Sequence, residues 1–115
     1  MEVKLAVAVR ADLGLGRGKI AAQVAHAAVA AVLANLGQDD FAAWLRDGQP
    51  KVILKVTTLE QLQDVVRRAQ AAGLPIELVH DAGRTQVRPG TLTCCAVGPA
   101  ESHRIDAVTA GLPLL

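Results

Sequence analysis

The chain alternates between short apolar runs and longer alanine-rich or amphipathic segments. The apolar runs are rich in valine and are bounded by polar residues, glycine or proline, which is typical of buried strands. Four such runs occur, at residues 3–9, 51–56, 76–80 and 91–97. The sequence therefore predicts four short strands.

The segments between these runs carry helix signals. Residues 19–36 are dominated by alanine, the strongest helix former, and Gly37 follows as a stop signal. Thr57 or Thr58 can cap a further helix that ends before Gly73, with Glu60 and Gln61 close to the capping-box position. Shorter helices are predicted at residues 40–46 and 101–109.

Strands that alternate with helices predict an α/β domain. Right-handed crossovers bring such strands into a mostly parallel sheet that helices cover on both faces, a three-layer α/β/α arrangement. At 115 residues the chain has the size of one domain, and a chain of this size buries roughly two-thirds of its unfolded surface. We therefore expect one domain over residues 1–115.

Charge and aromatic content limit the classes of partner. The formal net charge is only +1 and the only aromatic residues are Phe41 and Trp44, so a platform of stacked nucleic-acid bases is poorly supported. Cations nevertheless gather in or beside two glycine-marked loops: Arg10, Arg17, Lys19, Arg84 and Arg88. They form either a local basic patch or ordinary solvated charge.

The two cysteines bear on metal binding and on cellular compartment. Cys94 and Cys95 are adjacent, so on a strand they point to opposite faces and are poorly placed to bind one metal or to form a disulfide. Buried thiols suit a reducing cytosol, and we expect a cytoplasmic protein. No apolar run reaches membrane-spanning length, and the N-terminus lacks the order of a signal peptide.

The first candidate for chemistry is the loop at residues 14–19, which carries three glycines, Arg17 and Lys19 between a strand and a helix. Glycine N–H groups and a helix N-terminus attract anions, so this loop predicts phosphate binding. A P-loop match is weak because Ile20 stands where the magnesium-binding Ser or Thr should be. A dinucleotide fingerprint lacks the acid that should end the next strand. A flexible connector is the alternative.

Polar side chains continue from this loop along the predicted helix. Lys19, Gln23 and His26 lie at i, i+4 and i+7 and therefore form one stripe. The stripe either faces solvent or lines a cleft that begins at the glycine loop. A lone histidine is more often structural or solvent-facing, but because His26 shares its stripe with Lys19 and Gln23 we favour the cleft for all three residues.

The second candidate is the turn at residues 81–86, directly after the third strand. Ligands bind at the carboxyl ends of parallel strands, so Asp81 should reach the same sheet edge as Lys19. A carboxylate beside lysine would stay ionised and could act on water as a base. Thr85 and Thr93 could orient that water or a substrate oxygen. The alternative for Asp81 is an Asx-turn that only shapes the bend.

The sequence does not favour covalent catalysis or a catalytic metal ion. Ser102 is the only serine and lacks a nucleophile elbow, and mid-strand thiols usually serve packing. No histidine spacing makes a zinc site. An enzyme with this sequence would activate water without a metal, a cofactor or an acyl intermediate.

Five segments in order resemble the type II peptidyl-tRNA hydrolases of archaea and eukaryotes. They are residues 10–28, 48–52, 81–86, 89–91 and 98–100, and the similarity covers essentially the whole chain. Arg17 stands where the family usually has lysine, Glu101 where it often has proline, and the C-terminal tail also differs.

The resemblance implies a hydrolase that cleaves the ester between peptide and tRNA in peptidyl-tRNA, with a four-stranded mixed sheet and often a homodimer. It places the catalytic residues at Lys19, Asp81, Thr85 and Thr93. Candidate substrate-binding residues, some of them also from the loop chemistry above, are Arg17, Gly18, Gln23, His26 and Arg84. A non-catalytic module that grips tRNA or another phosphate ligand is the competing interpretation, and a nucleotide-binding domain is the third.

Overall fold

The computed structural model describes residues 2–82 and 87–115. The predicted elements are present in the predicted order, most within two residues of the expected bounds. They are β1 (Val3–Arg10), α1 (Arg17–Ala34), α2 (Asp39–Arg46), β2 (Lys51–Val56), α3 (Leu59–Ala71), β3 (Ile76–His80), β4 (Leu92–Glu101) and α4 (Ser102–Thr109). The last strand extends four residues further than its apolar run predicts, because Gly98 and Pro99 continue the strand instead of ending it.

The four strands form one sheet in the order β2-β1-β4-β3. β1 and β2 are parallel, whereas β4 is antiparallel to both of its neighbours. Three of the four strands therefore run in one direction, as expected of a mixed, mostly parallel sheet. Only one neighbouring pair is parallel, because β4 follows β3 through a loop instead of a helical crossover and inserts between β3 and β1.

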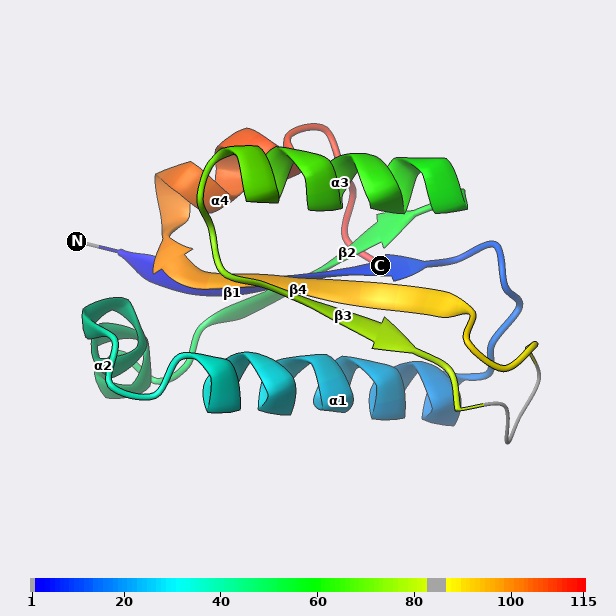
Figure 1. Cartoon of the computed structure of the whole chain (residues 1–115), viewed down its shortest axis with the longest axis horizontal. Helices are drawn as coiled ribbons and strands as arrows, with labels where there is room; N and C mark the ends of the chain where they lie inside the picture. Colours follow the sequence, from blue (N-terminus) through cyan, green and yellow to red (C-terminus); the bar gives the residue numbers. More distant parts are fainter. Residues whose placement is uncertain (1, 83–86) are drawn as a thin grey trace.

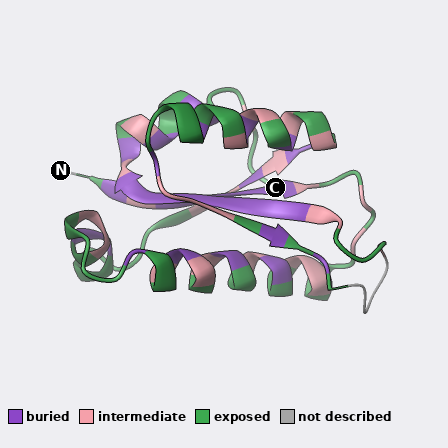
Figure 2. Cartoon of the chain, viewed as in Figure 1, coloured by how far each residue is buried: buried purple, intermediate pink, exposed green. Residues whose placement is uncertain are grey.

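Helices cover both faces of this sheet and give the predicted three layers. Figure 1 shows α1 and α2 on one face and α3 and α4 on the other. The central strands are buried almost throughout, while the outer surfaces of the helices are exposed (Figure 2). Cys94 packs in the core on the α1 side and Cys95 in the core on the α3 side. The prediction that the two thiols point to opposite faces is confirmed.

Small side chains let α1 lie close to the sheet. Ala27 and Ala31 are fully buried against it, and Gln23 precedes them on the same helix face. On the outer face, by contrast, Val29 and Leu33 are exposed. The alanine-rich sequence thus positions one helix face for packing and leaves an apolar stripe on the other.

The two sheet edges differ. Beside β2, the C-terminal tail pairs with the strand, since Leu115 N–H donates to the Ile53 carbonyl at 3.0 Å and Leu114 bridges to Leu54. At the opposite edge, no strand of the described chain pairs with the outer side of β3. β3 is therefore the open edge of the sheet, and it leads directly into Asp81.

Candidate active site

The candidate site lies where β1 and β3 end and β4 begins. Because β1 and β3 run in the same direction, both strands finish at the same end of the sheet (Figure 1). The glycine loop after β1 and Asp81 after β3 therefore start from that end. The reversed β4 lies between them, so Thr93, near its beginning, belongs to the same region. The topology thus brings together three distant segments of the chain.

Lys19 and Asp81 form an ion pair at this edge. Nζ of Lys19 lies 2.7 Å from Oδ1 of Asp81, whose side chain is fully buried, whereas the lysine side chain is 20% exposed. The sequence hypothesis required these groups to be within reach, and they are. A buried carboxylate without a cationic partner would cost several kcal/mol, on the order of 3–5, so the lysine compensates the buried charge.

The backbone of Asp81 is held as firmly as its side chain. Its N–H donates to the carbonyl oxygen of Thr91 at 2.8 Å, and its own carbonyl accepts from the N–H of Gly90 at 2.8 Å. These two bonds close the loop between β3 and β4 at its base. The carboxylate is consequently fixed on a hydrogen-bonded frame.

The first turn of α1 contributes positive electrostatic potential. The helix begins at Arg17 with Gly16 as N-cap, two residues earlier than predicted, and no acidic residue occupies its first turn. Lys19 therefore lies at the positive end of the helix dipole, next to Arg17 and Gly18, which are exposed. This combination attracts an anion such as phosphate or a developing oxyanion.

A buried hydrogen-bond chain connects α1, β4 and β3. Nε2 of Gln23 donates to Oγ1 of Thr93 at 3.0 Å, and that hydroxyl donates to the Val79 carbonyl at 3.1 Å. Gln23 is 2% exposed and Thr93 is fully buried. The single hydroxyl proton of Thr93 is therefore already used within the protein. This arrangement suits a residue that positions the site better than one that donates a proton to substrate.

The remaining predicted residues divide into two groups. His26 is exposed, because it lies one residue, roughly 100° around the helix, from the buried Ala27. The expectation that the whole polar stripe lines the cleft is therefore wrong for His26: Lys19 and Gln23 turn toward the site, whereas His26 turns to solvent. Arg84 and Thr85 lie outside the described residues.

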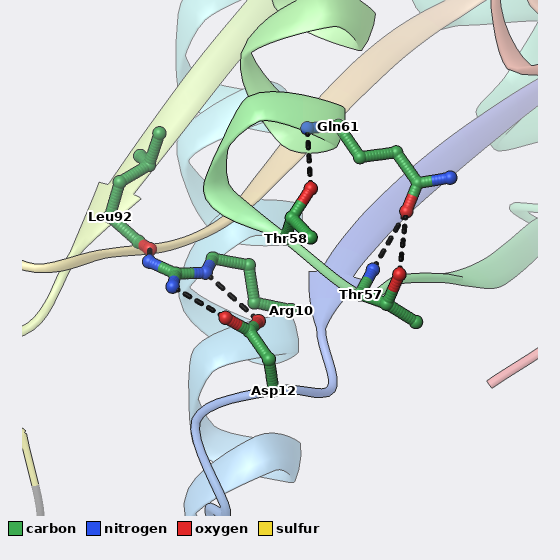
Figure 3. A network of polar contacts seen from close by, with 6 residues as sticks. All are labelled: Arg10, Asp12, Thr57, Thr58, Gln61 and Leu92. Atoms are coloured by element: carbon green, nitrogen blue, oxygen red, sulfur yellow. Dashed lines mark hydrogen bonds and ion pairs between the residues drawn. The ribbon is translucent and has the colours of Figure 1, made fainter.

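A second polar network flanks the site and was not predicted from the sequence (Figure 3). Arg10 donates from Nη2 and Nε to the two oxygens of Asp12, at 2.7 and 3.1 Å, and from Nη1 to the Leu92 carbonyl at 3.2 Å. These hydrogen bonds from Arg10 lower the pKa of Asp12. The arginine therefore anchors the start of the glycine loop to β4, and its charge is neutralised. The spacing of two residues between Arg10 and Asp12 was the only sequence signal that could have predicted this ion pair.

Figure 3 also draws the hydrogen bonds at the start of α3. Thr58 is its N-cap and accepts from the Gln61 N–H at 3.0 Å, as one of the two predicted caps. Oε1 of Gln61 in turn accepts from the Thr57 N–H at 2.7 Å (Figure 3). The reciprocal bonds of a capping box thus reach one residue beyond the cap.

Burial suppresses ionisation of both thiols in the folded chain. Burial raises the pKa of Cys94 to about 11. Burial, together with the neighbouring Cys94, raises the pKa of Cys95 to about 12. Neither thiol forms a nucleophilic thiolate near neutral pH. Across residues 2–82 and 87–115, no three His, Cys, Asp or Glu side chains are grouped to hold a metal ion.

The fold and site together define an α/β protein in which a buried aspartate pairs with a partly exposed lysine. This pair lies beside a glycine loop and a helix N-terminus that attract anions. A family model described as peptidyl-tRNA hydrolase PTH2 matches residues 3–115. The chain belongs to this family. The peptidyl-tRNA hydrolase of Metallosphaera sedula is 49% identical over 117 residues, which covers 98% of this chain and 100% of the relative. That of Aeropyrum pernix is 50% identical over 117 residues, 96% of this chain and 94% of the relative.

A more distant solved structure shares the fold. It is a protein of unknown function from Agrobacterium tumefaciens, with a TM-score of 0.60 and 20% sequence identity, and the match covers 100% of this chain and 98% of the other. At this identity the likeness concerns the fold alone. None of the described helices is long and apolar enough to cross a membrane.

Proposed function

We propose that this protein hydrolyses the ester bond between peptide and tRNA in peptidyl-tRNA, releasing free tRNA and peptide. Family membership supports the reaction, and the relatives in Metallosphaera sedula and Aeropyrum pernix are named for it. The observation that carries the proposal is the buried carboxylate of Asp81, 2.7 Å from Lys19 and beside a helix N-terminus.

In the proposed mechanism, Asp81 orients or deprotonates a water molecule. The water oxygen attacks the ester carbonyl carbon, the bond from that carbon to the ribose oxygen breaks, and a proton ends on the ribose oxygen. The products are a peptide carboxylate and free tRNA. Lys19 holds Asp81 in place and, with the α1 N-terminus, stabilises the negative charge that develops on the carbonyl oxygen.

The supporting residues have different roles in this mechanism. Gln23 and Thr93 position α1 against the sheet, so that Lys19 meets Asp81. Thr85 completes the polar shell, a role that rests on the family resemblance. Arg17 and Gly18 meet a tRNA phosphate at the start of α1, since both are exposed; Arg84 and the exposed His26 extend this contact.

A release assay tests the function. Incubation of the protein with an N-blocked aminoacyl-tRNA should yield free tRNA over many turnovers. A non-catalytic binding module on the same fold would retain the intact substrate, and its binding would weaken with salt in the same way. Release of tRNA therefore separates the two interpretations.

We also propose a cytoplasmic homodimer. The reducing cytoplasm fits two free buried cysteines and contains the proposed substrate. The exposed side chains of Val29, Leu33 and Leu36 lie at i, i+4 and i+7 along and just beyond α1. A two-fold axis would pair this stripe with its copy. Leu33→Glu should convert a dimer to a monomer in light scattering; a wild-type monomer would contradict the assignment.

A further inference from the structure

A groove lies on the sheet face opposite Lys19, between α3 and the open edge strand β3. Its volume is about 860 Å³. Its lining includes leucine and valine side chains from α3, β3 and β4, namely Leu59, Val66, Leu78 and Leu92. Leu78 is 43% exposed, whereas Ile76, two residues earlier on the same strand face, packs against the core. Val66 and Leu92 also pack against the core, so Leu78 supplies most of the apolar surface that the groove leaves exposed.

The groove reaches the backbone segment that holds Asp81, from the opposite face of the sheet. Gly90 and Thr91 line one end of it. These are the two residues whose backbone bonds hold Asp81, each at 2.8 Å. His80, which also lines the groove, directly precedes Asp81. A molecule that fills the groove therefore has one end beside the segment that carries the catalytic carboxylate.

The chemistry of the groove suits a peptide better than the nucleotides of the tRNA end. Its two arginines are already paired: Arg10 with Asp12 at 2.7 Å, and Arg67 with Asp64 at 3.3 Å. Nucleobases bind by stacking on aromatic rings. The chain's only Phe and Trp, Phe41 and Trp44, belong to α2, and the imidazole of His80 is the one ring among the residues that line the groove. Apolar amino-acid side chains, by contrast, fit a leucine-rich floor.

The open edge of β3 adds a way to bind peptides of any sequence. A peptide in extended conformation can pair its backbone with an unpartnered strand, and this recognition does not depend on side chains. The tail that pairs with β2 covers the other edge only. Since β3 runs toward Asp81, a peptide whose C-terminal ester lies at Asp81 would run parallel to β3.

We propose that the groove between α3 and β3 binds the peptide portion of peptidyl-tRNA, a proposal that rests on the proposed function. Basic residues at the start of α1 then hold the tRNA, and the groove holds the peptide. The scissile ester lies between them, at Lys19 and Asp81. The groove should contribute to substrates with several amino-acid residues and not to those with only one.

Variants that change the groove test this division. Leu78→Glu places a charge on the exposed floor, and Gln63→Trp fills the groove from an exposed position of α3 without removing a core side chain. Each should raise KM about tenfold for a tRNA that carries a tetrapeptide, because Leu78→Glu removes an apolar contact of about this size and Gln63→Trp occupies the space that the peptide needs. Each should leave KM for an N-acetyl-aminoacyl-tRNA within about twofold. Leu45→Glu, at a leucine of α2 that is 50% exposed, is the matched control and should affect neither substrate.

The possible results separate failure of the groove from failure of the function. If the wild type releases no tRNA from either substrate, the proposed function fails. If the wild type is active and the groove variants change both substrates equally, or neither, the peptide assignment alone is overturned. It is also overturned if the trinucleotide CCA inhibits the wild type and Leu78→Glu abolishes this inhibition, because the groove would then bind the tRNA end.

Discussion

The ammonium group of Lys19 lies 2.7 Å from the fully buried carboxylate of Asp81, although the two residues belong to different layers of the fold. The sheet order places the end of β1 and the end of β3 at one edge, and the first turn of α1 projects Lys19 toward it. The lysine compensates the buried negative charge of Asp81, and the carboxylate in turn fixes the orientation of the lysine side chain. The pair therefore couples stability to the proposed chemistry.

Removal of the lysine charge tests this coupling. Lys19→Met should lower the free energy of unfolding by about 3–5 kcal/mol, because it removes the cation that is paired with the buried Asp81 carboxylate. The double variant Lys19→Met/Asp81→Asn should recover part of that loss, since no buried charge remains. Urea unfolding of the wild type, both single variants and the double variant measures the coupling. Strictly additive effects would show that the two groups do not interact.

The buried hydroxyl of Thr93 is expected to position the site. Thr93→Val leaves Nε2 of Gln23 without its acceptor, so kcat should fall while KM stays nearly constant, and the free energy of unfolding should drop by about 1–3 kcal/mol. Thr109→Val is the matched control: this hydroxyl is also buried and bonds the Ile105 carbonyl at 2.9 Å, but in α4. It should lose stability and keep its kcat. Equal losses of kcat in both variants would contradict the positioning role.

The raised pKa values of the two thiols predict a loss of stability in alkali. Unfolded cysteine titrates near 9.0, whereas the folded thiols have pKa values of about 11 and about 12. Because the folded chain holds these protons more tightly, the free energy of unfolding should decrease as pH rises from 9 toward 11. Denaturant unfolding at several pH values measures this decrease. The variant Cys94→Ala/Cys95→Ala should show a smaller decrease, and an equal one would rule out the thiols as its source.

Local pattern was sufficient to predict the elements, because each strand is a distinct apolar run and each helix has its own stop or cap. Thr58 and Gly37 are examples. The start of α1 was placed two residues late, since Gly16 acts as an N-cap without a side chain. Strand order could not be read from the pattern, because insertion of β4 beside β1 depends on contacts between distant residues.

Part of the candidate site could be predicted from strand direction and helical spacing. Topology was enough to bring Lys19 and Asp81 to one edge, and helical spacing was enough to orient Gln23 inward with Lys19. Spacing alone could not show that His26 faces solvent, because that depends on which helix side packs on the sheet. The groove beside β3 was not foreseen, since it arises from the gap between two elements and not from any one segment.

The most direct test of the central claim is single-turnover release of tRNA from an N-acetyl-aminoacyl-tRNA by Asp81→Asn. The amide keeps the size of the side chain but cannot act as a base, so the rate should fall by about 10²-fold or more while substrate binding persists. Asp106→Asn, which changes an aspartate paired with Lys4 at 2.6 Å, is the control and should keep its full rate. A near-normal rate for Asp81→Asn would contradict the assignment of the Lys19–Asp81 pair as the catalytic centre.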